Sequence, residues 1–302
     1  MSSSDIERPT VRFVHTISES GRPLPSSSQW NSIEINYNLI PKSETAYDSL
    51  PSSYSKSIEF HLIITGDSRL QDGSSTGIDD LVGGIYDSRN SIKFSFPIAY
   101  TVTLLSWTVI EYHQKYNDIG ELDHVKDIIK WGSDYLLKLF VGSANNDSMN
   151  PNGINCWERP KDMTYQRPAS TCDITASDLV GEIVAALSVA SLVLKDDKAY
   201  SKDLVDVAEK LFELATNINS TKQGTYTTVD AYGGEARNFY NSSGYLDELI
   251  CGGTWLFFAT GNTSNLEDAT RKYDDAKKDK IPFDEGIFYW NNKFTANSII
   301  LI

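Results

Sequence analysis

The chain has 302 residues, of which 40% are hydrophobic and 11% aromatic, which is enough apolar material for a substantial core. Its 27 basic and 41 acidic residues give a net charge of −14, which argues against a nucleic acid partner, because phosphates require a basic surface. The three cysteines and four scattered histidines provide neither a disulfide framework nor the spacing of a zinc site, so we expect no metal and no cofactor.

The first 64 residues differ in composition from the rest of the chain. They are rich in Ser and Pro and lack helical periodicity, which predicts a mostly disordered tail over 1–64 and a second domain over 65–302. The chain begins without the apolar core of a signal peptide, so the encoded chain is expected in the cytosol.

From residue 66 onward, apolar-periodic segments alternate with loops rich in Gly, Asn and Pro. The apolar run 94–110 could be read as a short membrane span, but Ser, Thr and Pro interrupt it, which favours a buried helix. No strand pattern persists, so the sequence predicts an all-α domain of helical hairpins without a membrane span. The expected helices cover 97–117, 121–140, 176–194, 199–217, 243–260, 263–277 and 291–301.

The most informative motif is the segment 83–94, which reads GGIYDSRNSIKF. It resembles the motif G-G-Y-Y-D-A-G-D-x-x-K-F of family 9 glycoside hydrolases, the inverting endo-1,4-β-glucanases (cellulases). The first carboxylate of that motif is Asp87, which could also be an ordinary loop carboxylate that caps the next helix. The second carboxylate, which in the family takes the proton from the attacking water, is replaced by Asn90.

Six further blocks support the resemblance because they occur in the family's order. They cover 66–73, 104–112, 129–137, 156–163, 239–249 and 288–293. The segment 165–172 is similar to an insertion found in the plant membrane-anchored branch of the family, the KORRIGAN type, which resides at the plasma membrane and Golgi. Residues 1–64 look similar to the cytosolic tail of that branch, and 65–302 to the N-terminal half of its catalytic domain.

The resemblance implies an (α/α)6 barrel, a toroid of six helical hairpins, with a long cleft for a β-1,4-glucan. The inverting reaction needs an acid and a base carboxyl group that stand roughly 6.5–9.5 Å apart, so that water fits between them. The candidate sugar-lining side chains are aromatic or basic, and each could equally be a packing residue. They are Trp157, Arg159, Tyr240, Tyr245 and Trp290.

The sequence also departs from the family pattern. An amide has no basic lone pair near neutral pH, so Asn90 cannot act as the base. The acid Glu is expected beyond residue 302, Ile154 stands where a cleft His is expected, and Cys251 replaces a cleft Trp.

These departures predict a truncated, incomplete barrel with impaired catalysis, a pseudoenzyme. An incomplete barrel leaves apolar helix faces exposed, which predicts marginal stability or association with a partner. The alternatives are a non-catalytic glucan-binding or interaction protein, or the unstable product of a degenerate gene.

Overall fold

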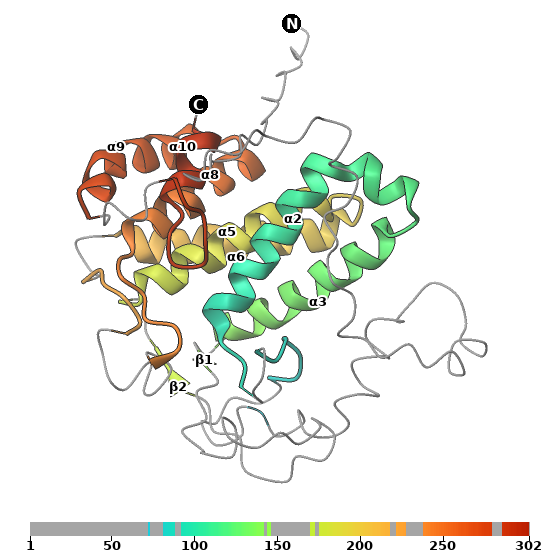
Figure 1. The fold of residues 1–302 in the computed structure, drawn as a ribbon, viewed down its shortest axis with the longest axis horizontal. Helices are drawn as coiled ribbons and strands as arrows, with labels where there is room; N and C mark the ends of the chain where they lie inside the picture. Colours follow the sequence, from blue (N-terminus) through green and yellow to red (C-terminus); the bar gives the residue numbers. More distant parts are fainter. Residues whose placement is uncertain are drawn as a thin grey trace, which may run out of the picture. The chain divides into compact units, whose positions relative to one another are not determined.

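Three helical hairpins and one further short helix account for most of the chain that the structure describes (Figure 1). The computed structural model describes residue 72 and residues 81–87, 92–141, 144–145, 170–172, 175–217, 222–227, 238–279 and 286–301. The hairpins are α2 (Ser95–Asp118) with α3 (Leu122–Val141), α5 (Ser177–Val193) with α6 (Lys198–Thr216), and α8 (Leu246–Thr260) with α9 (Thr263–Asp279), and α10 is Phe294–Ile300. A short antiparallel pair, β1 (Ala144–Asn145) and β2 (Ser170–Thr171), places Ala144 opposite Thr171.

All seven helices expected from the sequence are therefore present, with ends that differ by a few residues. The turns have local causes. Gly120 (φ +74°) separates α2 from α3, and Gly261 (φ +74°) ends α8 by donating its N–H to the Phe257 carbonyl. Asp197 caps α6 by accepting the backbone N–H of Tyr200 at 3.1 Å.

The helices form two layers. In Figure 1, α5 lies in the middle of the bundle between α2 and α8, and it also packs against α6. Every residue of α5 except Leu192 is buried, whereas α6 buries one stripe only. That stripe consists of Leu204, Ala208, Leu211, Phe212 and Ala215. We call α2, α5 and α8 the inner helices, and α3, α6 and α9 the outer helices.

Glycines allow α5 and α8 to approach closely. A Cβ atom on Gly181 would lie 2.6 Å from the backbone carbonyl carbon of Glu248, and one on Gly252 would lie 2.7 Å from the Gly181 oxygen. Gly252 also faces Val184, so the contacts advance in the same direction along both helices, which run parallel. Parallel inner helices, each paired with an outer helix, form part of an (α/α)6 barrel, and the predicted all-α fold class is confirmed.

None of the helices in the described ranges is both long and apolar enough to cross a membrane. The described residues all belong to one compact unit that spans Ser57–Ile302. The segment 1–64, predicted as a disordered tail, lies outside the described residues.

Candidate functional site

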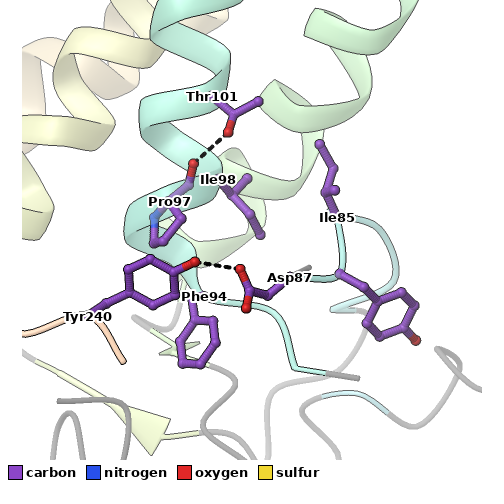
Figure 2. A pocket seen from close by; sticks show the side chains of 8 residues that line it. Ile85, Asp87, Phe94, Pro97, Ile98, Thr101 and Tyr240 are labelled. Carbon is purple, nitrogen blue, oxygen red and sulfur yellow. Dashed lines mark hydrogen bonds between the residues drawn. The ribbon is translucent and has the colours of Figure 1, made fainter. Parts of the chain in front are cut away.

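A pocket of about 240 Å³ lies at the N-terminal end of α2. Figure 2 shows the Asp87 carboxylate and the Tyr240 hydroxyl facing each other beside the first turns of this helix. The lining residues come from the loop before α2, from α2 itself and from the segment before α8. They are Ile85, Tyr86, Asp87, Phe94, Pro97, Ile98, Thr101 and Tyr240.

The loop that carries Asp87 packs against α3. Gly83 and Gly84 have φ values of +127° and +71°, which L side chains rarely adopt. A Cβ atom on Gly84 would also lie 3.0 Å from the Tyr135 ring, so glycine is required here for two reasons. The Asp87 N–H then donates to the Ile92 carbonyl at 2.8 Å and closes the loop.

Two long side chains of α3 hold the carbonyl groups of the same loop. Trp131 Nε1 donates to the Gly84 oxygen at 2.9 Å, and Lys138 Nζ donates to the Val82 oxygen at 2.8 Å. These bonds satisfy the loop backbone from outside the pocket. The position of Asp87 is therefore fixed by an outer helix as well as by its own loop.

Asp87 accepts a hydrogen bond from Tyr240. The Tyr240 hydroxyl lies 2.6 Å from Asp87 Oδ1, although the two residues are 153 positions apart in sequence (Figure 2). Burial, and then the Asp87 carboxylate, raise the pKa of Tyr240 above its ordinary value. Tyr240 consequently remains a neutral donor throughout the physiological pH range and orients the carboxylate in the pocket.

Aromatic rings continue from the pocket into the core. The Tyr240 ring meets Phe94 edge-on at 4.9 Å and Trp290 edge-on at 5.1 Å between centroids. Trp290 in turn meets the buried Phe96 ring at 5.7 Å. Edge-to-face contacts of this kind are favourable and restrict ring orientation. Tyr240 and Trp290 are only partly buried, so part of each side chain is exposed to solvent.

A buried carboxylate supports the segment that carries Tyr240. Asp178, in the first turn of α5, accepts the N–H groups of Leu179 at 2.7 Å and Tyr226 at 2.9 Å. The Tyr226 hydroxyl donates to the Tyr240 carbonyl. Burial raises the pKa of Asp178 to about 7. Sequence reasoning did not assign Asp178 or Tyr226 to the site; a carboxylate inside an otherwise apolar helix was the available signal.

The predicted site residues fall into three groups. Asp87 and Tyr240 line the pocket, and Trp290 packs against Tyr240. Tyr245 is half-buried just before α8, where it packs against the core and does not line the pocket. Three residues lie outside the described part of the chain: Asn90, Trp157 and Arg159.

Two further sequence expectations concern cysteine and metal. Cys251, expected at a cleft position, lies within α8 as a free thiol that is only 2% exposed, because this face of the helix points into the bundle. Ile154 lies outside the described residues. Where the structure describes the chain, no group of three or more His, Cys, Asp or Glu side chains could hold a metal ion.

Paired inner and outer helices, with a carboxylate and edge-on aromatic rings at one end of the inner layer, place the chain among proteins with an (α/α)6 barrel. The chain belongs to glycosyl hydrolase family 9, whose family model matches residues 49–302. The family predicted from the motif at 83–94 is therefore confirmed.

Plant endoglucanases are among the curated relatives. The chain is 45% identical to Endoglucanase 25 of Arabidopsis thaliana over 257 residues, and 41% identical to Endoglucanase 10 of Oryza sativa subsp. japonica over the same length. Each alignment covers 78% of this chain and 40% of the relative. The chain thus spans less than half the length of these relatives. Membership of the membrane-anchored branch and the domain boundary at 64/65 stay predictions.

Solved structures agree with the fold. The endoglucanase of the termite Nasutitermes takasagoensis superposes with a TM-score of 0.70 at 32% identity, covering 83% of this chain and 56% of that one. The cellulase Cel9M of C. cellulolyticum in complex with cellobiose gives a TM-score of 0.66 at 26% identity, covering 76% and 53%. The chain therefore superposes on about half of each of these structures.

Proposed function

We propose that the chain binds a β-1,4-glucan at the pocket around Asp87, and that its hydrolytic activity is impaired by Asn90. The hydrogen bond from Tyr240 to Asp87 carries the binding part of this proposal. It orients a carboxylate acceptor next to partly exposed aromatic rings, and sugars bind through hydroxyl donors and apolar ring faces. Membership of a cellulase family and the likeness to a cellobiose-bound structure support the same ligand class.

The impairment follows from the chemistry of inversion. The base must take a proton from water while an acid protonates the leaving oxygen, so two carboxyl groups are needed. The sequence has Asn90 at the family's base position, and a carboxamide does not accept this proton near neutral pH. Asp87 and Tyr240 can orient a sugar or a water, but they do not supply the second carboxylate.

Binding is tested by calorimetric titration with cellohexaose. We expect Asp87→Ala to weaken binding about tenfold or more, because a charge-assisted hydrogen bond to a sugar hydroxyl is lost. Tyr240→Phe should weaken it by a smaller factor, since the ring stays and only the hydroxyl that orients Asp87 is removed. Lys202→Met, on the exposed face of α6, is the control and should bind like the wild type. No heat at millimolar cellohexaose would contradict the proposal.

Hydrolysis is tested by measuring reducing ends released from carboxymethyl-cellulose. We expect the wild type to release no more than Asp87→Ala, and release above that control would show that catalysis is intact. Asn90→Asp restores the carboxylate at the family's base position. A higher rate of hydrolysis than the wild type would show that Asn90 causes the impairment. A thermal melt should accompany both assays, because a non-cooperative melt would favour an unstable chain over a binding protein.

A further inference from the structure

A buried lysine, Lys293, lies next to Trp290 and Phe96, two of the aromatic residues that continue from the pocket into the core. Lys293 is 0% exposed, and its Nζ lies 2.8 Å from Glu182 Oε2 on α5 and 4.0 Å from Glu248 Oε1 on α8. The same ammonium group lies 4.8 Å from the ring centroid of Tyr100 and 5.2 Å from that of Phe96, both on α2. One cation therefore contacts all three inner helices.

This ammonium group also donates to the carbonyl oxygen of Trp290. The backbone around it is fixed as well, because the Lys293 N–H donates to Asp247 Oδ2 on α8 at 2.8 Å. Asn297 adds two bonds to this arrangement: its N–H donates to the Lys293 carbonyl, and its Nδ2 donates to the Asp247 carbonyl, each at 2.8 Å. These hydrogen bonds attach the C-terminal end of the turn that carries Trp290 to the inner helix α8.

The ion pair needs an explanation other than stability. Burial is the largest single influence and lowers the pKa of Lys293, but the charges of Glu182 and Glu248 and the hydrogen bond to Glu182 together raise it above the ordinary value. The group stays charged, and buried charges must be paired and hydrogen-bonded to be tolerated. Apolar residues of similar volume often replace buried ion pairs without loss of stability. We therefore look for a role of this ion pair in fixing the geometry of its neighbours rather than in stabilising the fold.

The geometry connects this cation to the pocket through two intermediate contacts. Trp290 meets Tyr240 edge-on at 5.1 Å, and Tyr240 donates to Asp87. A displacement of the Trp290 backbone would therefore move the ring that sets the position of the Tyr240 hydroxyl.

We propose that Lys293 is a positioning residue for the glucan-binding face, which fixes Trp290 against Tyr240 and so keeps Tyr240 aligned with Asp87. The proposal rests on the proposed glucan-binding function. It assigns to Lys293, Glu182 and Glu248 a role in ligand affinity although none of them lines the pocket.

The test neutralises Lys293 together with its two glutamate partners, so that neither glutamate is left charged without its cation, and Asp247 keeps the Lys293 N–H as its donor. The triple variant Lys293→Met/Glu182→Gln/Glu248→Gln is compared with the wild type and with Lys202→Met. Cellohexaose affinity is measured by calorimetry. The environment of Trp290 is followed by fluorine NMR of protein labelled with 5-fluorotryptophan. The chain has six tryptophans, so the spectrum needs an assignment. Trp290→Phe assigns the resonance by its disappearance.

We expect the triple variant to melt cooperatively, to bind cellohexaose about tenfold more weakly, and to shift the Trp290 resonance, while Lys202→Met changes neither signal. In the triple background, Trp290→Phe should cause much less further loss of affinity than in the wild type, since the ring is already displaced. A purely structural role would not produce this coupling.

Unchanged affinity together with an unchanged Trp290 resonance would overturn the proposal, and so would strictly additive effects of the triple variant and Trp290→Phe. If the wild type does not bind cellohexaose, the proposed function fails, and the resonance alone decides whether Lys293 positions Trp290. If the triple variant does not fold, Lys293→Arg replaces it. Its planar guanidinium cannot reproduce the ammonium contacts, so the Trp290 resonance should shift, and an unshifted resonance overturns the proposal.

Discussion

The inner helix α5 and the outer helix α6 are consecutive and similar in length, yet they bury their residues differently. α5 is buried on all sides and carries two buried carboxylates, Asp178 and Glu182. α6 buries one apolar stripe and keeps its charges in solvent, as in the Lys202–Asp206 pair four residues apart. Changes in the inner layer should therefore reach both the core and the pocket, whereas changes on the outer surface should reach neither.

Truncation of a leucine should show the largest difference in stability between the two layers. Leu187 on α5 is 0% exposed, and Leu187→Ala should lower the free energy of unfolding by about 3–4 kcal/mol through lost burial and a residual cavity. Leu214 on α6 is 42% exposed, and Leu214→Ala should cost about 0.5 kcal/mol or less. Urea unfolding of both variants measures the difference. Equal losses would show that α5 is not the centre of the core.

The layers should also differ in their dependence on pH. Because the pKa of Asp178 is raised to about 7, the folded state keeps a proton that the unfolded state has lost above its own pKa of about 4. The folded state then binds more protons between these values, so stability should fall as pH rises from 4 to 7, by on the order of 2–3 kcal/mol from this group.

Asp178→Asn should remove this part of the slope in urea unfolding measured at several pH values. Leu214→Ala is the outer-layer control and should keep the slope of the wild type. A wild-type slope in Asp178→Asn would show that Asp178 is not the titrating group.

The helices could be predicted from the sequence because apolar periodicity and turn residues are local signals. The family blocks at 83–94 and 239–249 likewise predicted Asp87 and Tyr240 as cleft residues, and both line one pocket in the structure. The hydrogen bond between them could not be predicted, because it depends on packing across 153 positions. Glu182 and Glu248 are both buried beside Lys293. Their cation was not identified, since nothing local distinguishes a lysine that will be buried from one that will be exposed.

A smaller effect is expected where glycines allow the helices to pack closely. Gly181→Ala places a methyl group 2.6 Å from the Glu248 backbone, which cannot rotate away, so we expect a loss of about 2 kcal/mol. Gly132→Ala, on the outer helix α3, meets only the Val102 side chain, and better helix propensity offsets part of the overlap, which leaves a loss of about 1 kcal/mol or less. Urea midpoints of the two variants give the order, and the reverse order would contradict close backbone packing of α5 on α8.

The smallest effect is expected at the outer surface, where Lys202 and Asp206 form an ion pair whose side chains are 71% and 40% exposed. Water and salt screen such pairs, and ordering two long side chains opposes the attraction. Lys202→Met should therefore leave the urea midpoint within experimental error of the wild type at low and at high salt. Lys293→Met alone removes a cation of the same type from between Glu182 and Glu248, which are both buried, and should lower the midpoint clearly. If both variants unfold at the same urea concentration, burial does not determine how much these lysines contribute to stability. The inner and outer layers would then not differ in this respect.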